Sequence, residues 1–214
     1  MPFKLTGPKR PTAGTAFTCS AAAKRCGKGD VALLVHKNLT CRLALLAFAA
    51  TAGHVHAQGS VADEYQVKAA FLFNFAKFVE WPADTFKAPD DPITICVWGQ
   101  DPFGSALDDV VRNKTVAGRP FVVHQVSSAH QAAKCQIVFV ASSERKRTRS
   151  VLEDLKGHSV LTVGEVEDFI PNGGVINFKL KDARVRIEID NGAAERTKLR
   201  ISSKLLSLAE IAKK

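Results

Sequence analysis

The stretch CQIVFVAS, residues 135–142, is almost wholly apolar. Continuous apolar strands of this kind lie in the middle of a sheet whose two faces are both covered. Two further strands are predicted by PITICVWG (92–99), a β-branched run that ends at Gly99, and by RPFVVHQV (119–126). These three runs predict a sheet that is buried under a layer of chain on each side.

Helical patterns alternate with these strands. Helical spacing runs from Asp63 to Glu80 and stops before Pro82, because the residue that precedes a proline avoids the helical region. The other expected elements are a helix at 101–113 with Pro102 near its first turn, a helix at 143–155 capped by Ser142 or Ser143, a short strand at 158–164, one or two helical turns at 165–170, a hairpin at 173–190 and an amphipathic helix at 202–213 capped by Ser202 or Ser203. This order predicts an α/β fold: a three-layer sandwich with a mixed β-sheet flanked by helices, ending in a C-terminal β-hairpin and helix. No long linker divides residues 58–214, so we expect a single domain there.

The second arm of the hairpin alternates in polarity. Val185, Ile187 and Ile189 are separated by charged residues, among them Arg184 and Arg186. A period of two predicts one buried and one solvated face.

The first helix carries more aromatic rings than one apolar face requires. Turning about 100° per residue, its core stripe consists of Phe71, Leu72, Phe75, Phe78 and Val79. Phe73 falls outside that stripe: around the helix axis, it points in a direction between those of Lys77 and Glu80. It is either a contact for a partner or a ring that a neighbouring loop covers. Lys68, Asn74, Lys77 and Glu80 interrupt the apolar run, which argues against a transmembrane helix.

The net charge of +9 belongs mainly to the N-terminal region. Residues 1–57 contain eight Lys or Arg and one acidic residue, which leaves 22 basic and 20 acidic residues from Gln58 onward. The remaining domain is nearly neutral. We therefore do not expect a nucleic-acid partner.

The N-terminal region has the pattern of a secretory signal. Lys37 and Arg42 flank the start of LALLAFAATAG, and VHA (55–57) supplies small residues before a cleavage site between Ala57 and Gln58. We expect residues 37–57 to be a signal peptide, and a buried core helix is the alternative. For residues 1–36, either the start codon is assigned too far upstream or the signal has a long, disordered n-region.

Removal of residues 1–57 would leave two cysteines, Cys96 and Cys135. In an exported protein they are compatible with a disulfide that closes a loop of about 40 residues and stabilises by roughly 3–4 kcal/mol. Two buried free thiols are the alternative, because sequence separation does not show the geometry that a bridge needs.

No pattern in the sequence indicates catalysis. His124, His130 and His158 lack metal-ligand spacing, and GQDPFGS (99–105) lacks the lysine of a phosphate loop. There is no G-x-S-x-G or C-x-x-C motif. We expect a protein that is not an enzyme, with no cofactor and no metal site, which acts through its surfaces.

Three groups of residues are candidates for binding a partner. Besides Phe73, they are the basic run ERKRTR, which would otherwise be a solvated helix face, and the exposed face of the last strand. The cations of these groups are Arg145, Lys146, Arg147, Arg149, Arg184 and Arg186.

Four stretches in order resemble the YfiR family of exported bacterial proteins. They are EYQVKAAFLFNFAKFVEWP (64–82), ITICVWGQDPFG (93–104), VLTVGEVEDFIPNGGVINF (160–178) and RVRIEIDNGAAERTKLRISSKLLSLA (184–209). The likeness spans about residues 63–212, and the motifs are specific in combination.

The resemblance implies a periplasmic regulator. Family members are known as inhibitors that bind the periplasmic segment of an inner-membrane diguanylate cyclase, and an outer-membrane lipoprotein can sequester them. Dimerisation and disulfide-dependent stability are family traits, and Cys96 and Cys135 fall on a cysteine pair of the family. A second pair that some members carry is missing here.

Two other functions remain open. A small-molecule sensor or solute-binding module would use strand-end loops such as Gly99–Gly104 to line a pocket. A thiol redox protein would depend on Cys96 and Cys135 alone.

Overall fold

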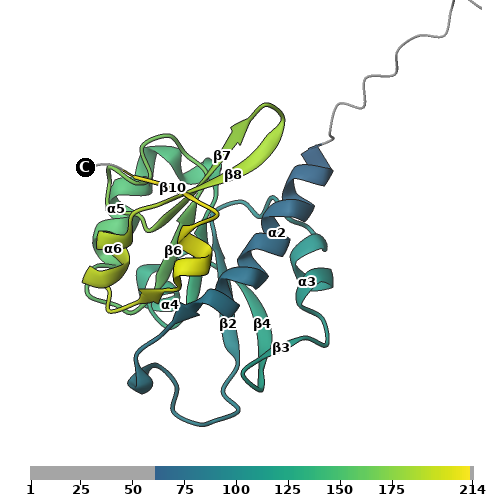
Figure 1. Ribbon diagram of the computed structural model, residues 1–214, viewed down its shortest axis with the longest axis vertical. Helices are drawn as coiled ribbons and strands as arrows, with labels where there is room; N and C mark the ends of the chain where they lie inside the picture. The colour runs from purple at the N-terminus through teal and green to yellow at the C-terminus, as the bar shows by residue number, and fades with distance from the viewer. Residues whose placement is uncertain (1–60, 213–214) are drawn as a thin grey trace, which may run out of the picture. The chain divides into compact units, whose positions relative to one another are not determined.

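The computed structural model describes residues 61–212 (Figure 1). Its elements, in chain order, are α2 (Val61–Phe78), β1 (Val79–Glu80), η2 (Ala83–Thr85), β2 (Ile93–Trp98), α3 (Ala106–Val111), β3 (Thr115–Val116), β4 (Arg119–Val126), α4 (Ala129–Ala132), β5 (Ile137–Val140), η3 (Ser142–Arg147), α5 (Thr148–Asp154), β6 (Leu161–Gly164), β7 (Ile176–Lys181), β8 (Arg184–Ile189), α6 (Asn191–Arg196), β9 (Arg200–Ile201), α7 (Ser203–Leu206) and β10 (Glu210–Ile211).

An eight-stranded mixed sheet organises these elements, with the strand order β10-β8-β7-β6-β5-β2-β4-β3. The run from β7 to β4 is parallel, whereas β8 and β3 pair antiparallel with their hairpin partners. The apolar stretch that predicted a central strand is β5, which lies between β2 and β6. All four residues of β5 are buried.

The sheet is covered on both faces, which confirms the predicted three-layer sandwich. Ile137 and Phe139 of β5 belong to a core that includes residues of α2 and α3, such as Leu72 and Leu107. The alternate residues of β5 belong to a second core with α4 and α5. Because successive strand residues point to opposite faces, β5 packs against both helical layers.

Helix α2 ends at Phe78 rather than at the predicted Glu80. Val79 and Glu80 instead pair antiparallel with β9, and the N–H of Ser202 donates to the carbonyl of Phe78. The Trp81 indole N–H then donates to the Gln136 carbonyl at 3.2 Å. The end of α2 is therefore tied to a distant part of the chain, which helical periodicity does not reveal.

Two predicted helices are shorter than expected. The helix at 101–113 is confined to α3, because an aspartate turn in which Asp101 accepts from the N–H of Phe103 precedes it. The region 143–155 starts as the 3-10 helix η3, and α5 begins only at Thr148. Neither predicted serine caps it: Ser143 Oγ accepts from the N–H of Gln100, and the N–H of Ser142 donates to Glu165.

Residues 165–170 form turns instead of the expected helical turns. Phe169 is fully buried there, between two glycines. A Cβ atom at Gly164 or Gly174 would lie 2.2 Å from the Phe169 ring, so only glycine fits at either position.

The C-terminal helix is limited to α7, with the predicted cap at Ser202, whose side chain accepts from the N–H of Leu205. The last described residues form β10 rather than a continued helix. Glu210 and Ile211 pair in parallel with Glu188 and Ile189.

The predicted hairpin is confirmed as β7 and β8. Its loop consists of Asp182 and Ala183, which have φ values of 51° and 56°. Two residues with positive φ form the type I′ turn that suits the twist of two antiparallel strands. As expected, Ile187 and Ile189 are buried and Arg184 and Arg186 are exposed.

Cys96 and Cys135 form a disulfide, which settles the choice between a bridge and two free thiols. Their Cα atoms are 6.1 Å apart across 39 residues of chain. Both side chains lie in the core shared with α4 and α5, and they are 1% and 4% exposed. The bond joins the middle of β2 to the segment that leads into β5.

Replacing both cysteines with alanine, as Cys96→Ala/Cys135→Ala, should lower the free energy of unfolding by roughly 3–4 kcal/mol. The cross-link restricts the unfolded chain, and alanine avoids burying a hydroxyl group in the apolar core. Equilibrium urea unfolding without reductant measures the difference, and the reduced wild type serves as the control. Equal midpoints for variant and oxidised wild type would show that the bond contributes nothing.

Candidate partner-binding surface

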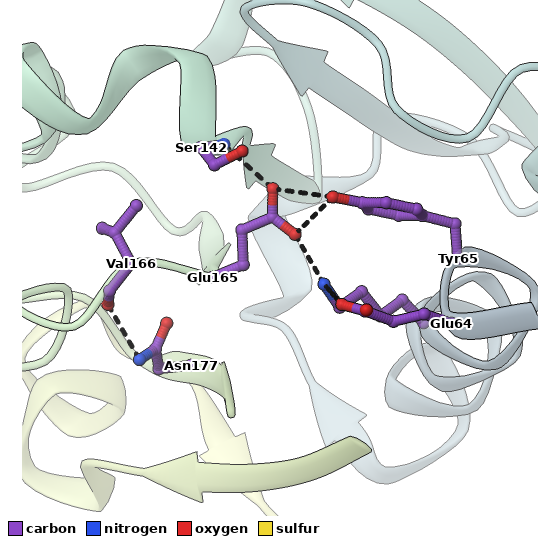
Figure 2. Close-up of polar contacts among 7 residues, drawn as sticks. Glu64, Tyr65, Ser142, Glu165, Val166 and Asn177 are labelled. Atoms are coloured by element: carbon purple, nitrogen blue, oxygen red, sulfur yellow. Dashed lines mark hydrogen bonds and ion pairs between the residues drawn. The ribbon is translucent and has the colours of Figure 1, made fainter. Parts of the chain in front are cut away.

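A buried ion pair fixes α2 to the sheet. Glu165 follows β6 directly, and one of its carboxylate oxygens lies 2.7 Å from Nζ of Lys68, with the side chains 5% and 6% exposed (Figure 2). Lys68 also forms an ion pair with Glu64, one turn earlier on α2. The cation is thus shared between its own helix and the carboxyl end of a central strand.

Two more donors complete the surroundings of Glu165 (Figure 2). The Tyr65 hydroxyl donates to its carboxylate at 3.2 Å, and the N–H of Ser142 donates at 2.9 Å. Burial raises the pKa of the Tyr65 phenol well above its ordinary value, and the charge of Glu165 and its hydrogen bond act in the same direction. A carboxylate held by a cation, a hydroxyl and an amide is suited to anchoring a helix.

The anchored helix borders a groove that also involves the β7–β8 hairpin. This α2–hairpin groove has a volume of about 380 Å³. Its lining residues are Asp63, Glu64, Val67, Phe71, Leu180, Ala183, Arg184 and Val185. Leu180 is 61% exposed and Val67 is 43% exposed. Figure 1 shows the hairpin tip and the start of α2 at the same end of the domain.

The structure covers Phe73, so this residue offers little surface to a partner. Its side chain is only 9% exposed, and its ring lies 5.3 Å from the ring of Phe121 in β4. The ammonium groups of Lys77 and Lys114 lie 4.3 Å and 4.7 Å from its centre. Phe73 is a core ring capped by two cations, and we exclude it from the candidate surface.

The basic run is exposed on η3 and at the start of α5. Arg145, Lys146, Arg147 and Arg149 are all exposed, and Arg147 forms an ion pair with Glu144 at 3.4 Å. The run belongs to η3 and α5, whereas Arg184 and Arg186 belong to β8.

Arg184 and Arg186 share one face of the hairpin with two lysines of β7. The register places Arg184 opposite Lys181 and Arg186 opposite Lys179. Residues that face one another across two strands point to the same side of the sheet. The hairpin thus has a face with four cations, and Leu180 and Val185 lie on its opposite face.

A polar pocket of about 390 Å³ lies at the carboxyl ends of β2 and β4. Its lining residues are Trp98, Gly99, Gln125, Val126, Ser127, Gln131, Glu144 and Arg147. Of the loop proposed to line a ligand pocket, only Gly99 contributes, whereas residues 100–104 do not.

Of the residues that build the anchor and the groove, Arg184 alone is among the sequence-based candidates. Lys68 is a cation in a largely apolar part of α2, and Glu165 directly follows a buried strand, so each offered a weak signal. Leu180 is an apolar residue between two lysines. None of these positions reveals its distant partner, since such contacts depend on the folded topology.

Three further observations delimit the site. The expected cleavage site at Ala57 and Gln58 lies outside the described residues. In residues 61–212, histidine, cysteine and acidic side chains form no group that could hold a metal ion. No helix in this part of the chain has both the length and the apolar character needed to cross a bilayer.

Comparison with known proteins yields one family. The sequence model of a family described as YfiR/HmsC-like matches residues 65–210. Curated proteins give no significant match.

Two solved structures show a weaker likeness. One is a conserved domain protein from Vibrio cholerae, with a TM-score of 0.49 and 9% identity. The other is the ABC domain in complex with L-Trp from Streptococcus pneumonia, with a TM-score of 0.46 and 10% identity. Each comparison covers 70% of this chain and 60% of the other chain.

The substitutions Glu165→Gln and Lys68→Met should each lower the free energy of unfolding by about 3 kcal/mol. Lys68→Met leaves the buried Glu165 without its cation, and Glu165→Gln leaves the buried Lys68 with Glu64 alone, so the pair should also show strong coupling in a double-mutant cycle. Glu153→Gln is the matched control, because Glu153 pairs with Lys156 on the surface and its loss should cost less than about 1 kcal/mol. Urea unfolding measures the stability of the three single variants and of the double variant Lys68→Met/Glu165→Gln. Equal costs at Glu165 and Glu153 would refute the anchor.

The phenol of Tyr65 should titrate well above pH 10. The chain contains one tyrosine, so the ultraviolet absorbance of tyrosinate reports this group alone. Because the folded pKa lies above the unfolded one, the stability linked to the neutral phenol is present below about pH 10 and is lost as the pH rises past it. A midpoint near 10 in the folded protein would contradict the burial of this phenol beside Glu165.

Proposed function

Because this chain belongs to the YfiR/HmsC-like family, we propose that it binds the periplasmic segment of an inner-membrane diguanylate cyclase and represses synthesis of cyclic di-GMP. The family consists of periplasmic regulators of diguanylate cyclase signalling, and their action is regulatory rather than catalytic. The family match over residues 65–210 is the observation that carries the proposal.

Export is part of the proposal. Residues 37–57 serve as a signal peptide that is cleaved between Ala57 and Gln58, and residues 58–214 are the exported domain. The Cys96–Cys135 disulfide supports this location, since disulfides persist in oxidising compartments.

Repression requires a difference in affinity. A bound protein changes the activity of a membrane receptor only if it prefers one conformational state of that receptor. A preference of about 3 kcal/mol shifts the equilibrium more than a hundredfold. A surface that is already formed before binding loses little conformational entropy in the complex, and the anchored α2 provides such a surface.

Further partners follow from the family. The protein acts as a homodimer, and an outer-membrane lipoprotein lifts repression by sequestering it. It needs no cofactor, carries out no catalysis and does not bind nucleic acid. Its near-neutral domain is consistent with the last point.

A small-molecule sensor is the second candidate, and the strand-end pocket favours it. Glu144 lines that pocket, and its buried Oε2 atom has no hydrogen-bond partner in the described part of the chain, although Arg147 lies 3.4 Å away. A ligand with a donor group could satisfy this oxygen and tune repression. Strong thermal stabilisation by one metabolite, abolished by Glu144→Gln, would support this candidate.

Deleting the gene should raise cellular cyclic di-GMP and biofilm formation, because the cyclase loses its inhibitor. Mass spectrometry of extracted nucleotides measures the first effect. The full chain expressed from a plasmid should restore the low level. A version that lacks residues 1–57 is the matched control, and it should fail because it stays in the cytosol. Unchanged cyclic di-GMP after deletion would contradict the proposed function.

A further inference from the structure

We propose that the outer edge of β8 accepts an extended segment of the partner as an additional strand, and that this segment alternates acidic and apolar residues. The inference rests on the proposed function, because it specifies how the receptor is bound. Strand addition supplies affinity through the backbone and specificity through alternate side chains.

The edge of β8 is only partly occupied. β10 pairs with Glu188 and Ile189, and no other described strand pairs with this side of β8. Residues 184–187 therefore form an open edge within the part of the chain that the structure describes. In a hairpin closed at Lys181 and Arg184, hydrogen-bonded and non-hydrogen-bonded pairs alternate, so the N–H and C=O of Val185 point away from β7.

On the cationic face of this edge, two of the four cations form no ion pair in the described part of the chain. Lys179 forms an ion pair with Glu188 at 2.8 Å, and Lys181 forms one with Glu210 at 3.7 Å. For Arg184 and Arg186, no carboxylate lies within ion-pair distance in residues 61–212. Opposite charges on neighbouring strands attract, so these two arginines favour acidic residues on an added strand.

The other face of the same edge is largely apolar, although Asp63, Glu64 and Arg184 also line the groove beside it. Val185 lines the α2–hairpin groove together with Val67, Phe71 and the exposed Leu180. Side chains of an added strand would point alternately to the arginines and into this groove. An added strand in a single register can thus place acidic side chains beside the arginines and apolar side chains in the groove. Such a strand must alternate acidic and apolar residues.

Two other occupants fit less well. If a second copy paired with the first through β8, antiparallel about Val185, Arg184 of each chain would lie opposite Arg186 of the other. Like charges in directly opposed positions destabilise a strand pair. An anionic membrane surface would meet Arg186 or the groove, but not both, because they lie on opposite faces of the hairpin. Arg184 borders the groove as well, but so do the acidic Asp63 and Glu64, which disfavour an anionic surface there.

Binding of a synthetic peptide to the purified protein tests the inference. The probe is a short peptide of alternating glutamate and valine, and a peptide of the same composition with its glutamates in one block is the control. The alternating peptide should bind more tightly and should perturb the amide resonances of residues 185–187. Equal binding of the two peptides would overturn the proposal.

Three variants make the test specific. Val185→Pro removes the outward N–H and should weaken binding by about tenfold, whereas Val185→Thr keeps that N–H and should bind like the wild type. Arg184→Glu/Arg186→Glu should also weaken binding by about tenfold. Arg145→Glu/Arg149→Glu makes the same change in net charge in the basic run of η3 and α5 and should have no effect. Should Val185→Pro fail to fold, the two arginine double variants still decide the question.

Each alternative occupant has its own outcome. Dissociation of a dimer by Val185→Pro, without peptide binding, would assign the edge to a second copy and overturn the proposal. Binding to phosphatidylglycerol vesicles that depends on Arg184 and Arg186, without peptide binding, would assign it to the membrane and overturn it as well.

Cyclic di-GMP in the deletion strain separates the inference from the proposed function. Complementation by Arg184→Glu/Arg186→Glu should fail, and complementation by Arg145→Glu/Arg149→Glu should succeed. If deletion raises cyclic di-GMP but both variants restore it, the inference is wrong and the function stands. If deletion has no effect, the proposed function is wrong, and peptide binding alone decides whether the edge accepts a strand.

Discussion

The carboxylate of Glu165 connects parts of the chain that are far apart in sequence. Glu165 directly follows β6 and forms an ion pair with the ammonium of Lys68. Its carboxylate also accepts hydrogen bonds from the hydroxyl of Tyr65 and the N–H of Ser142. A buried charge is stable only when its partners remain in place, so the group resists any movement of α2 along the sheet. The position of α2, and with it one wall of the α2–hairpin groove, depends on this carboxylate.

A fixed helix gives the regulator a surface that exists before its partner arrives. The groove combines exposed apolar side chains with an open strand edge and two unpaired arginines in the described part of the chain. Each feature alone is common on protein surfaces. Together they are the basis on which we propose an extended partner of defined polarity, whose binding to one state of a receptor would shift the activity of that receptor.

The parts of the fold that depend on local pattern were predictable from sequence. The apolar strands and the β7–β8 hairpin follow from residue periodicity. A strand buried on both faces is a continuous apolar run, and a strand buried on one face alternates apolar and polar residues. The short helix α7 and strand β10 did not follow, because pairing with β8 overrides the helical spacing of the last residues. Glu165 was missed because its partner Lys68 is distant in the chain. For Phe73 the sequence left open a partner contact or a covered ring, and packing against the distant Phe121 decides for the covered ring.

The most direct measurement is cyclic di-GMP synthesis by a membrane diguanylate cyclase of the same cell, purified and embedded in lipid nanodiscs. Adding the purified regulator should lower the rate of synthesis, and the Arg184→Glu/Arg186→Glu protein should leave that rate high. A rate that does not respond to the regulator at saturating concentration would contradict the account.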